Sequence, residues 1–182
     1  MLKTCDILDE SDKHLRAKNI EVIFPLSKER IKLINDMLDH LYYSQIEEYS
    51  KKYNLRPGMG LAAPQVGINE RFFVVCHEES ENVFKNYILI NPKMISHSEE
   101  LIYAAEGEGC LSVNREFPGI VPRYARVTFT GYDIFGKPIK IRAREELSIA
   151  FQHELDHLNG ILFIDHIDPK DPYKNKDYMR EI

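Results

Sequence analysis

The segment from Gln152 to His157 constrains this chain more than any other, because it reads Q-H-E-x-D-H within a helical pattern. Residues four apart on a helix share one face, with Cβ atoms roughly 5–6 Å apart, so His153 and His157 can bind the same metal ion. Glu154 then lies where its carboxylate can reach a water on that metal as a general base. The motif predicts a metal-dependent hydrolase but leaves its kind open.

The residues around this motif bear on whether the histidines face a site. One alternative is an ordinary polar helix face on which imidazoles pair with nearby carboxylates. Against it, Phe151, Leu155 and Leu158 are placed to bury the other side of the helix. We therefore expect the histidine pair to face something specific.

A third metal ligand is needed, since catalytic sites of this kind combine three protein ligands with one open position for water. One family of metalloproteases extends the motif to H-E-x-x-H-x-x-G-x-x-H. Gly160 matches its glycine, but Phe163 stands where its last ligand would be. A downstream carboxylate, Asp165 or Asp168, remains open, as does a thiolate from elsewhere in the chain.

Among the three cysteines, Cys110 is the best candidate for such a thiolate. It lies in E-G-C-L-S, where Gly109 permits close backbone approach and no strand pattern accounts for a cysteine. Cys76 ends an apolar run and is predicted to be core, and Cys5 lies in a terminal segment without a motif. A lone cysteine is more often a small buried hydrophobe, so the prediction depends on the histidine pair.

The stretch 58–67 is rich in glycine and alanine and holds one polar side chain, Gln65. It lacks the Lys-Ser/Thr of a phosphate-binding loop and the spacing of a dinucleotide fingerprint. Small residues let a substrate backbone approach closely, and the Gln65 amide could donate a hydrogen bond to a developing oxyanion. The alternative is a tight turn with a glutamine facing solvent.

Charge and cysteine content exclude several classes of protein. A formal net charge of -5 argues against direct nucleic-acid binding, which needs a basic face. Three cysteines cannot all pair within the chain, so reduced thiols and a cytoplasmic location are expected. No apolar run approaches the roughly 18 residues of a membrane span, so no membrane association is predicted.

The pattern predicts an α+β fold in one catalytic domain, residues 1–182, with antiparallel or mixed β-sheets around the central helix that carries the motif. Residues 1–26 look irregular, and a long N-terminal helix is expected after the N-cap Ser27. A second helix should end at Asn159-Gly160, and a short polar tail should cover about 168–182. The predicted helices are 28–52 and 145–158; the predicted strands are 71–76, 87–90, 127–132, 137–142 and 161–164, with a hairpin turn at 133–136.

Three motifs together resemble the peptide deformylase family. The family pattern is G-x-G-x-A-A-x-Q, then E-G-C-x-S, then Q-H-E-x-D-H, and segments 58–65, 108–112 and 152–157 match it in that order. The similarity extends from about Phe24 to Ile167. Stretches 40–57 and 113–119 are similar to the longer, insertion-bearing subtype of Gram-positive and related bacteria. The polar tail does not read as the long C-terminal helix that some relatives use at the ribosome.

The resemblance implies removal of the N-formyl group from formyl-methionyl nascent peptides, with release of formate. It also implies that Cys110, His153 and His157 bind one divalent metal ion, with Fe²⁺ first and Ni²⁺, Co²⁺ or Zn²⁺ as alternatives. The implied partners are these nascent peptides, and a transient ribosome contact is left open.

A mechanism follows for such a site. Glu154 accepts the proton of the attacking water and delivers it to the leaving amine. The Gln65 amide and the backbone N–H of Leu111 stabilise the oxyanion. Substrate-binding positions are also expected, along the peptide backbone and around the methionine side chain: Met59, Gly60, Gly109, Ile149 and Ala150.

Two rival functions remain at this stage. A zinc endopeptidase would use His153, His157 and a downstream carboxylate, and would not need Cys110. A non-catalytic metal-binding protein descended from such an enzyme would be expected to have lost Glu154 or Gln65, and both are present.

Overall fold

The apolar side chains of one central strand alternate between two hydrophobic cores, one on each face of the sheet. In the computed structural model, which describes residues 1–182, β2 (Phe72–Ser80) directs Phe72, Val74 and Cys76 toward α1 (Lys28–Ser44). Phe73 and Val75 point to the opposite face and pack against α3 (Glu145–Leu158). This follows from the two-residue period of a strand. The sheet is therefore covered by one helix on each face.

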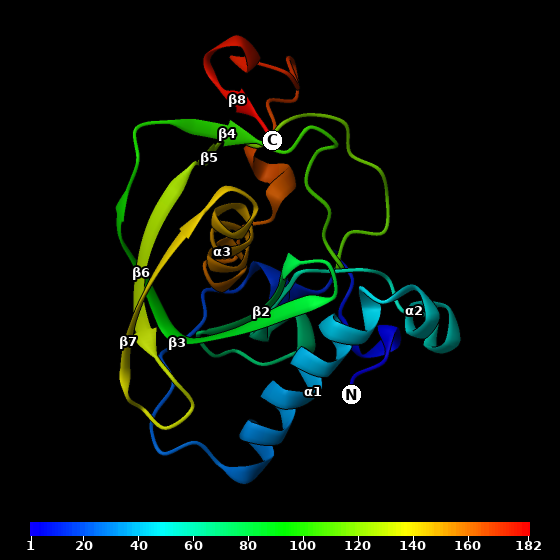
Figure 1. Cartoon of the computed structure of the whole chain (residues 1–182), viewed down its shortest axis with the longest axis vertical. Helices are drawn as coiled ribbons and strands as arrows, with labels where there is room; N and C mark the ends of the chain where they lie inside the picture. The colour runs from blue at the N-terminus through cyan, green and yellow to red at the C-terminus, as the bar shows by residue number, and fades with distance from the viewer.

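Two sheets make up the β structure (Figure 1). The larger has the order β1-β2-β3-β6-β7 with antiparallel neighbours, so β1 and β7 form its edges. The smaller has the order β5-β4-β8, with β8 parallel to β4. Their bounds are Gly60–Ala62 for β1, Val83–His97 for β3, Leu101–Tyr103 for β4, Arg123–Tyr124 for β5, Arg126–Tyr132 for β6, Pro138–Arg144 for β7 and Arg180–Glu181 for β8.

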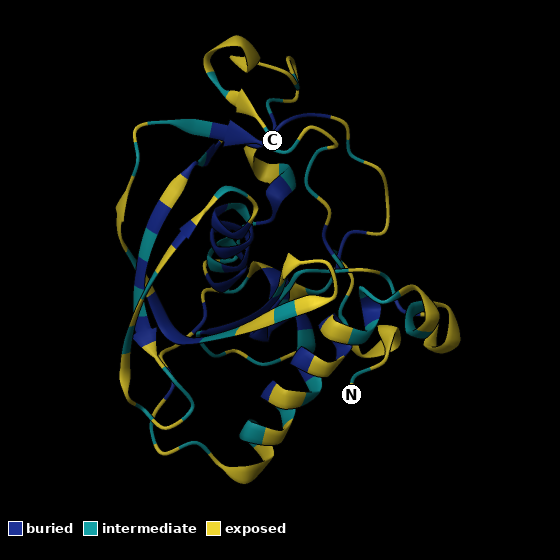
Figure 2. Ribbon diagram, in the orientation of Figure 1, coloured by how far each residue is buried: buried dark blue, intermediate teal, exposed yellow.

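The motif helix α3 lies at the centre of the molecule and is almost entirely buried (Figure 2). Phe151 and Leu158 are fully buried beneath the larger sheet, and Leu155 is half-buried against the same core. The helix ends at Leu158, Asn159 is its C-cap, and Gly160 adopts a positive φ of 74°. The predicted helix 145–158 and its stop are confirmed, as is the α+β class.

The predicted helix 28–52 is wrong as one continuous element. Helix α1 begins after Ser27, whose hydroxyl accepts from the backbone N–H of Arg30, but it ends at Ser44. A separate short helix, α2, covers Glu47–Tyr53. The Gln45 side chain donates to the carbonyl of Cys76 in β2, while Ile46 is extended. This tertiary hydrogen bond holds the chain against β2 at the point where the helix is interrupted. Helical periodicity alone does not reveal such an interruption.

The predicted strand 161–164 is also wrong. The chain forms a 3₁₀ turn at Phe163–His166, where the carboxylate of Asp165 accepts the backbone N–H of Leu162. Its apolar residues pack into the core beside α3 without a partner strand. A short apolar run cannot be assigned to a strand by pattern alone.

The expected polar tail has more order than its composition indicates, although no long helix forms there. It contains a 3₁₀ turn at Lys176–Tyr178 and strand β8. Arg180 bridges Glu100 and Glu145, and the Tyr103 hydroxyl donates to Glu181. These contacts bring the tail beside the N-terminal end of α3. No helix of the chain is long and apolar enough to cross a membrane.

Candidate active site

Three buried side chains that can hold a metal converge between α3 and the segment after β4. Their ligand atoms, the Cys110 thiol and one imidazole nitrogen each of His153 and His157, all lie within 4.8 Å of one another. The Cys110 Sγ is 3.3 Å from His157 Nε2. Helical spacing brings the two histidines together, and the loop carrying Cys110 approaches them from the side. Soft thiolate and imidazole ligands suit Fe²⁺ or Zn²⁺ better than Ca²⁺ or Mg²⁺.

A buried charge network orients the first of these histidines. Its Nδ1 donates to Glu108 at 2.8 Å, which leaves Nε2 of His153 available to a metal. Arg123 bridges Glu108 and Asp156, at 2.6 Å to each, and is itself only 4% exposed. Burial alone would raise the pKa of Glu108, but the charge of Arg123 and the hydrogen bond from His153 lower it to about 2. Glu108 is thus an ionised anchor for the imidazole.

Glu154 is the one buried carboxylate of the site that has no charged partner. It is 3% exposed, and its Oε2 has no hydrogen-bond partner in the protein. Burial raises the pKa of Glu154 to about 7. Gly60 of β1 makes room for this side chain, since a Cβ at that position would lie 2.3 Å from Glu154 Oε1. A carboxylate so placed can exchange protons with a ligand in the cavity.

The amide of Gln65 is buried beside the thiol, so the alternative of a solvent-facing glutamine is excluded. Its oxygen accepts the backbone N–H of Ala62, and its nitrogen lies 3.2 Å from Ser112 Oγ and 3.6 Å from Cys110 Sγ. The backbone N–H of Leu111, the residue that follows Cys110, donates to no protein acceptor. Two donors therefore lie next to Cys110, and the Leu111 N–H is free.

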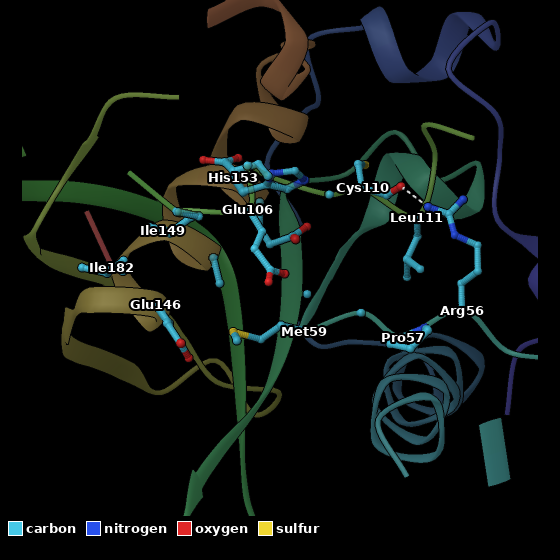
Figure 3. Close-up of a pocket in the computed structure, with 18 of the residues that line it drawn as sticks. Arg56, Pro57, Met59, Glu106, Cys110, Leu111, Glu146, Ile149, His153 and Ile182 are labelled. Carbon is cyan, nitrogen blue, oxygen red and sulfur yellow. Dashed lines mark hydrogen bonds and ion pairs between the residues drawn. The ribbon is translucent and has the colours of Figure 1, made fainter. Parts of the chain in front are cut away.

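A cavity of about 600 Å³ opens in front of these groups (Figure 3). Its apolar lining includes Ile149 and Ala150, one helical turn before His153, and Ile182 from the tail. All the residues that the sequence analysis assigned to substrate, base, oxyanion or metal line it, except His157: Met59, Gly60, Gln65, Gly109, Cys110, Leu111, Ile149, Ala150, His153 and Glu154. His157 lies behind them, 1% exposed.

The carboxylates considered as alternative metal ligands lie elsewhere. Asp165 forms an ion pair with Arg16, and Asp168 with Lys174. Phe163 stacks on the ring of His153, with 6.1 Å between centroids. The position that would carry the last histidine of the metalloprotease motif thus supports the imidazole by packing.

Sequence reasoning missed the residues that hold the site in place. Glu108 and Asp156 stand inside the quoted motifs, yet neither received a role, and Arg123 was not singled out at all. A signal was present for the first two, because acidic residues inside a metal motif commonly hydrogen-bond a ligand. Nothing in the local pattern marks Arg123, which reaches the site only through the fold.

The fold and the Cys-His-His set with its adjacent glutamate define a metal hydrolase, and comparison with known proteins gives the family. The family model for polypeptide deformylase matches residues 4–173. A peptide deformylase of Macrococcus caseolyticus is 49% identical over 96% of this chain and 95% of its own length. Peptide deformylase 2 of Bacillus anthracis is 44% identical over 97% and 96%, respectively.

Solved structures agree with this assignment. The crystal structure of Arabidopsis thaliana peptide deformylase 1B in complex with an inhibitor has a TM-score of 0.75 and 31% identity, covering 90% of this chain and 82% of that one. The chain belongs to the peptide deformylase family.

Proposed function

We propose that this chain removes the N-formyl group from formyl-methionyl nascent chains with the residues assembled in the cavity. The observation that carries the proposal is the unpaired, buried carboxylate of Glu154 beside the converging Cys110, His153 and His157. The family supplies the reaction class, and this geometry supplies groups suited to it. Residues 1–182 would act as one catalytic domain.

The donor set fits a divalent metal ion. One thiol and two imidazoles converge, and the carboxylate of Glu108 orients His153 as is usual for a metal-bound histidine. When bound, the cation would lower the pKa of a water and polarise the formyl oxygen. Fe²⁺ is our first choice, ahead of Ni²⁺, Co²⁺ and Zn²⁺, because the resemblance to the family favours it.

Glu154 would carry the proton through the reaction. Its carboxylate takes a proton from the water that attacks the formyl carbon, and then delivers that proton to the amine as the C–N bond breaks. The products are formate and a free amino terminus. Gly60 supports this role, because any side chain there would displace the carboxylate.

The oxyanion of the tetrahedral intermediate would be met by two donors. The backbone N–H of Leu111 has no protein acceptor and is free to bind it, and the Gln65 amide nitrogen lies 3.6 Å from the neighbouring Cys110 Sγ. Losing one such donor typically costs about 10²–10³ in rate. The methionine side chain would occupy the apolar part of the cavity at Ile149 and Ala150, with Met59, Gly60 and Gly109 along the backbone.

Formate release from formyl-Met-Ala-Ser by protein loaded with Fe²⁺ without oxygen tests the proposal. Glu154→Gln should keep one metal per chain but lose about 10²–10⁴ in rate, the usual contribution of a general acid–base group. Cys110→Ser should lose metal. Glu81→Gln, a charge change in the exposed β2–β3 turn, is the matched control. Normal turnover by Glu154→Gln would refute the proton path, and full metal in Cys110→Ser would refute the ligand set.

The same assay separates the rival function. A zinc endopeptidase would cleave internal peptide bonds, leave the formyl group in place and tolerate Cys110→Ser. Action in the cytoplasm is also proposed, because the substrates are nascent chains. A transient ribosome contact would fit the same substrates, and co-sedimentation with ribosomes would detect it.

A further inference from the structure

Arg56 holds the loop that carries the thiol, and its guanidinium pairs with no carboxylate. It donates to the carbonyl of Cys110 at 2.8 Å (Figure 3) and to that of Val113 at 3.2 Å. It also donates to the side-chain oxygen of Asn114. All three acceptors are uncharged, although Arg56 is half-buried. The positive charge of Arg56 therefore acts on the backbone of this loop.

The loop forms a tight turn over residues 110–113, and Arg56 contacts the carbonyl at each end of it. The N–H of Val113 donates to the carbonyl of Cys110 at 3.1 Å. That carbonyl thus accepts two hydrogen bonds, one within the turn and one from Arg56, which satisfies both of its lone pairs. These two bonds fix the orientation of the peptide group that joins Cys110 to Leu111.

Fixing this peptide group also fixes the N–H of Leu111. The bond between Cys110 and Leu111 is trans, and in a trans peptide the C=O and the N–H point in opposite directions. The Leu111 N–H therefore points away from Arg56, and it donates to no protein acceptor. It is left for a ligand in the cavity that Cys110 and Leu111 line.

The backbone that carries Arg56 is itself restrained on both sides. Leu55 is 6% exposed, and its N–H and C=O both bond to one residue of α2. Pro57 follows, and a residue before proline is confined to extended conformations. Gly58 then packs against the turn, since a Cβ there would lie 2.8 Å from Leu111 Cδ1. The side chain of Arg56 therefore starts from a fixed point beside the turn.

We propose that Arg56 is a positioning residue of the reaction: it orients and polarises the Cys110–Leu111 peptide so that the Leu111 N–H stabilises the oxyanion. The proposal rests on the deformylase function proposed above. A hydrogen bond from a charged donor is stronger than one from a neutral donor, and hydrogen bonds in a chain polarise one another. The guanidinium thus makes the N–H on the far side of the peptide a stronger donor. This effect is greatest in the transition state, where negative charge develops on the formyl oxygen.

Formate release from formyl-Met-Ala-Ser by the metal-loaded enzyme, with the rate expressed per bound metal ion, tests the proposal. In Arg56→Ala, kcat should fall by about 10–10²-fold, which does not exceed the usual cost of losing an oxyanion donor outright. KM should stay within about twofold of wild type, because the lost interaction belongs to the transition state. Arg56→Lys keeps the charge but lacks the planar fork, so its kcat should lie between those of wild type and Arg56→Ala.

Chemical rescue separates positioning from a general loss of structure. Arg56→Ala leaves space for a guanidinium ion, so millimolar guanidinium chloride should raise its kcat by at least about threefold. Sodium chloride at the same concentration should not, and the metal content per chain should match that of wild type. Arg115→Met is the matched control, because the Arg115 guanidinium pairs with Glu10 instead of the turn carbonyls. This control should keep the wild-type kcat.

Several outcomes would overturn the inference. One is a kcat of Arg56→Ala within about threefold of wild type. Another is a raised KM with an unchanged kcat, which would make Arg56 a substrate-binding residue. A loss of metal that accounts for the whole fall in turnover, or no rescue by guanidinium, would do the same. If Arg56→Ala does not fold, an unchanged kcat in Arg56→Lys decides against the inference and a lowered kcat at constant KM supports it. Absence of formate release by wild type would instead overturn the proposed function.

Discussion

Replacing Gly60 by alanine tests whether the position of one carboxylate controls the rate. The new Cβ would lie 2.3 Å from Glu154 Oε1 and within 3.0 Å of two further atoms of that side chain. Moving the oxygen out to only 3.0 Å requires a shift of 0.7 Å, by subtraction. Glu154 is fixed in the middle of a buried helix, so its carboxylate must turn away. Since a misplacement of about 1 Å can cost 10²-fold, we expect kcat to fall by about 10–10².

The assay is formate release at saturating substrate, together with metal content and the thermal midpoint of unfolding. Metal content should stay at the wild-type level, because the three atoms nearest to a Cβ at Gly60 all belong to Glu154 and not to a proposed ligand. In a Glu154→Asp background, whose shorter side chain leaves room for the methyl group, the same alanine should cost much less, so the double-mutant cycle should be non-additive. A kcat within threefold of wild type, or additive effects, would refute the reasoning.

Two further predictions concern stability. Arg123→Met should lower the free energy of unfolding by about 3–5 kcal/mol, because buried Glu108 and partly buried Asp156 both lose the positive charge of the guanidinium that they share. Arg126→Met, which breaks an exposed ion pair, should cost less than about 1 kcal/mol. Equal losses in urea titrations would contradict this. Burial lowers the pKa of His40 below its usual value. On acidification the unfolded chain therefore binds that proton before the folded chain does, and the free energy of unfolding falls below about pH 6.5. In a His40→Gln variant the free energy of unfolding should decline less steeply between pH 7.5 and 5.5, and an equally steep decline would be evidence against this role.

The catalytic candidates were accessible from the sequence because they stand in short, ordered motifs. Helical spacing alone brings His153 and His157 together, whereas Cys110 joins them only through the fold. The spacing of residues cannot show Arg123 reaching both Glu108 and Asp156, because the contact runs between β5, a loop and α3. Supporting residues of this kind carry no periodic signal of their own.

Secondary structure was predictable where one helical or strand periodicity dominated the local sequence. The prediction failed where tertiary contacts determined the end or the type of an element. Helix 145–158 and the hairpin around 133–136 follow from local pattern and turn chemistry. The break after Ser44 depends on a hydrogen bond from Gln45 to a distant strand. The run 161–164 has strand-like composition, but Asp165 caps it into a 3₁₀ turn. The two short strands β4 and β5 are too brief to leave a pattern.

The two edges of the larger sheet differ in how they meet other polypeptides. Strand β7 exposes Pro138, Lys140, Arg142 and Arg144 at alternate positions, and such residues discourage edge-to-edge aggregation. Strand β1 is only three residues long and uncharged, and Gly60 opens it onto the cavity. A misfolded or neighbouring chain is thus repelled at the long, accessible edge. The short edge carries no charged residue or proline, and its first residue faces the cavity of about 600 Å³ instead of open surface.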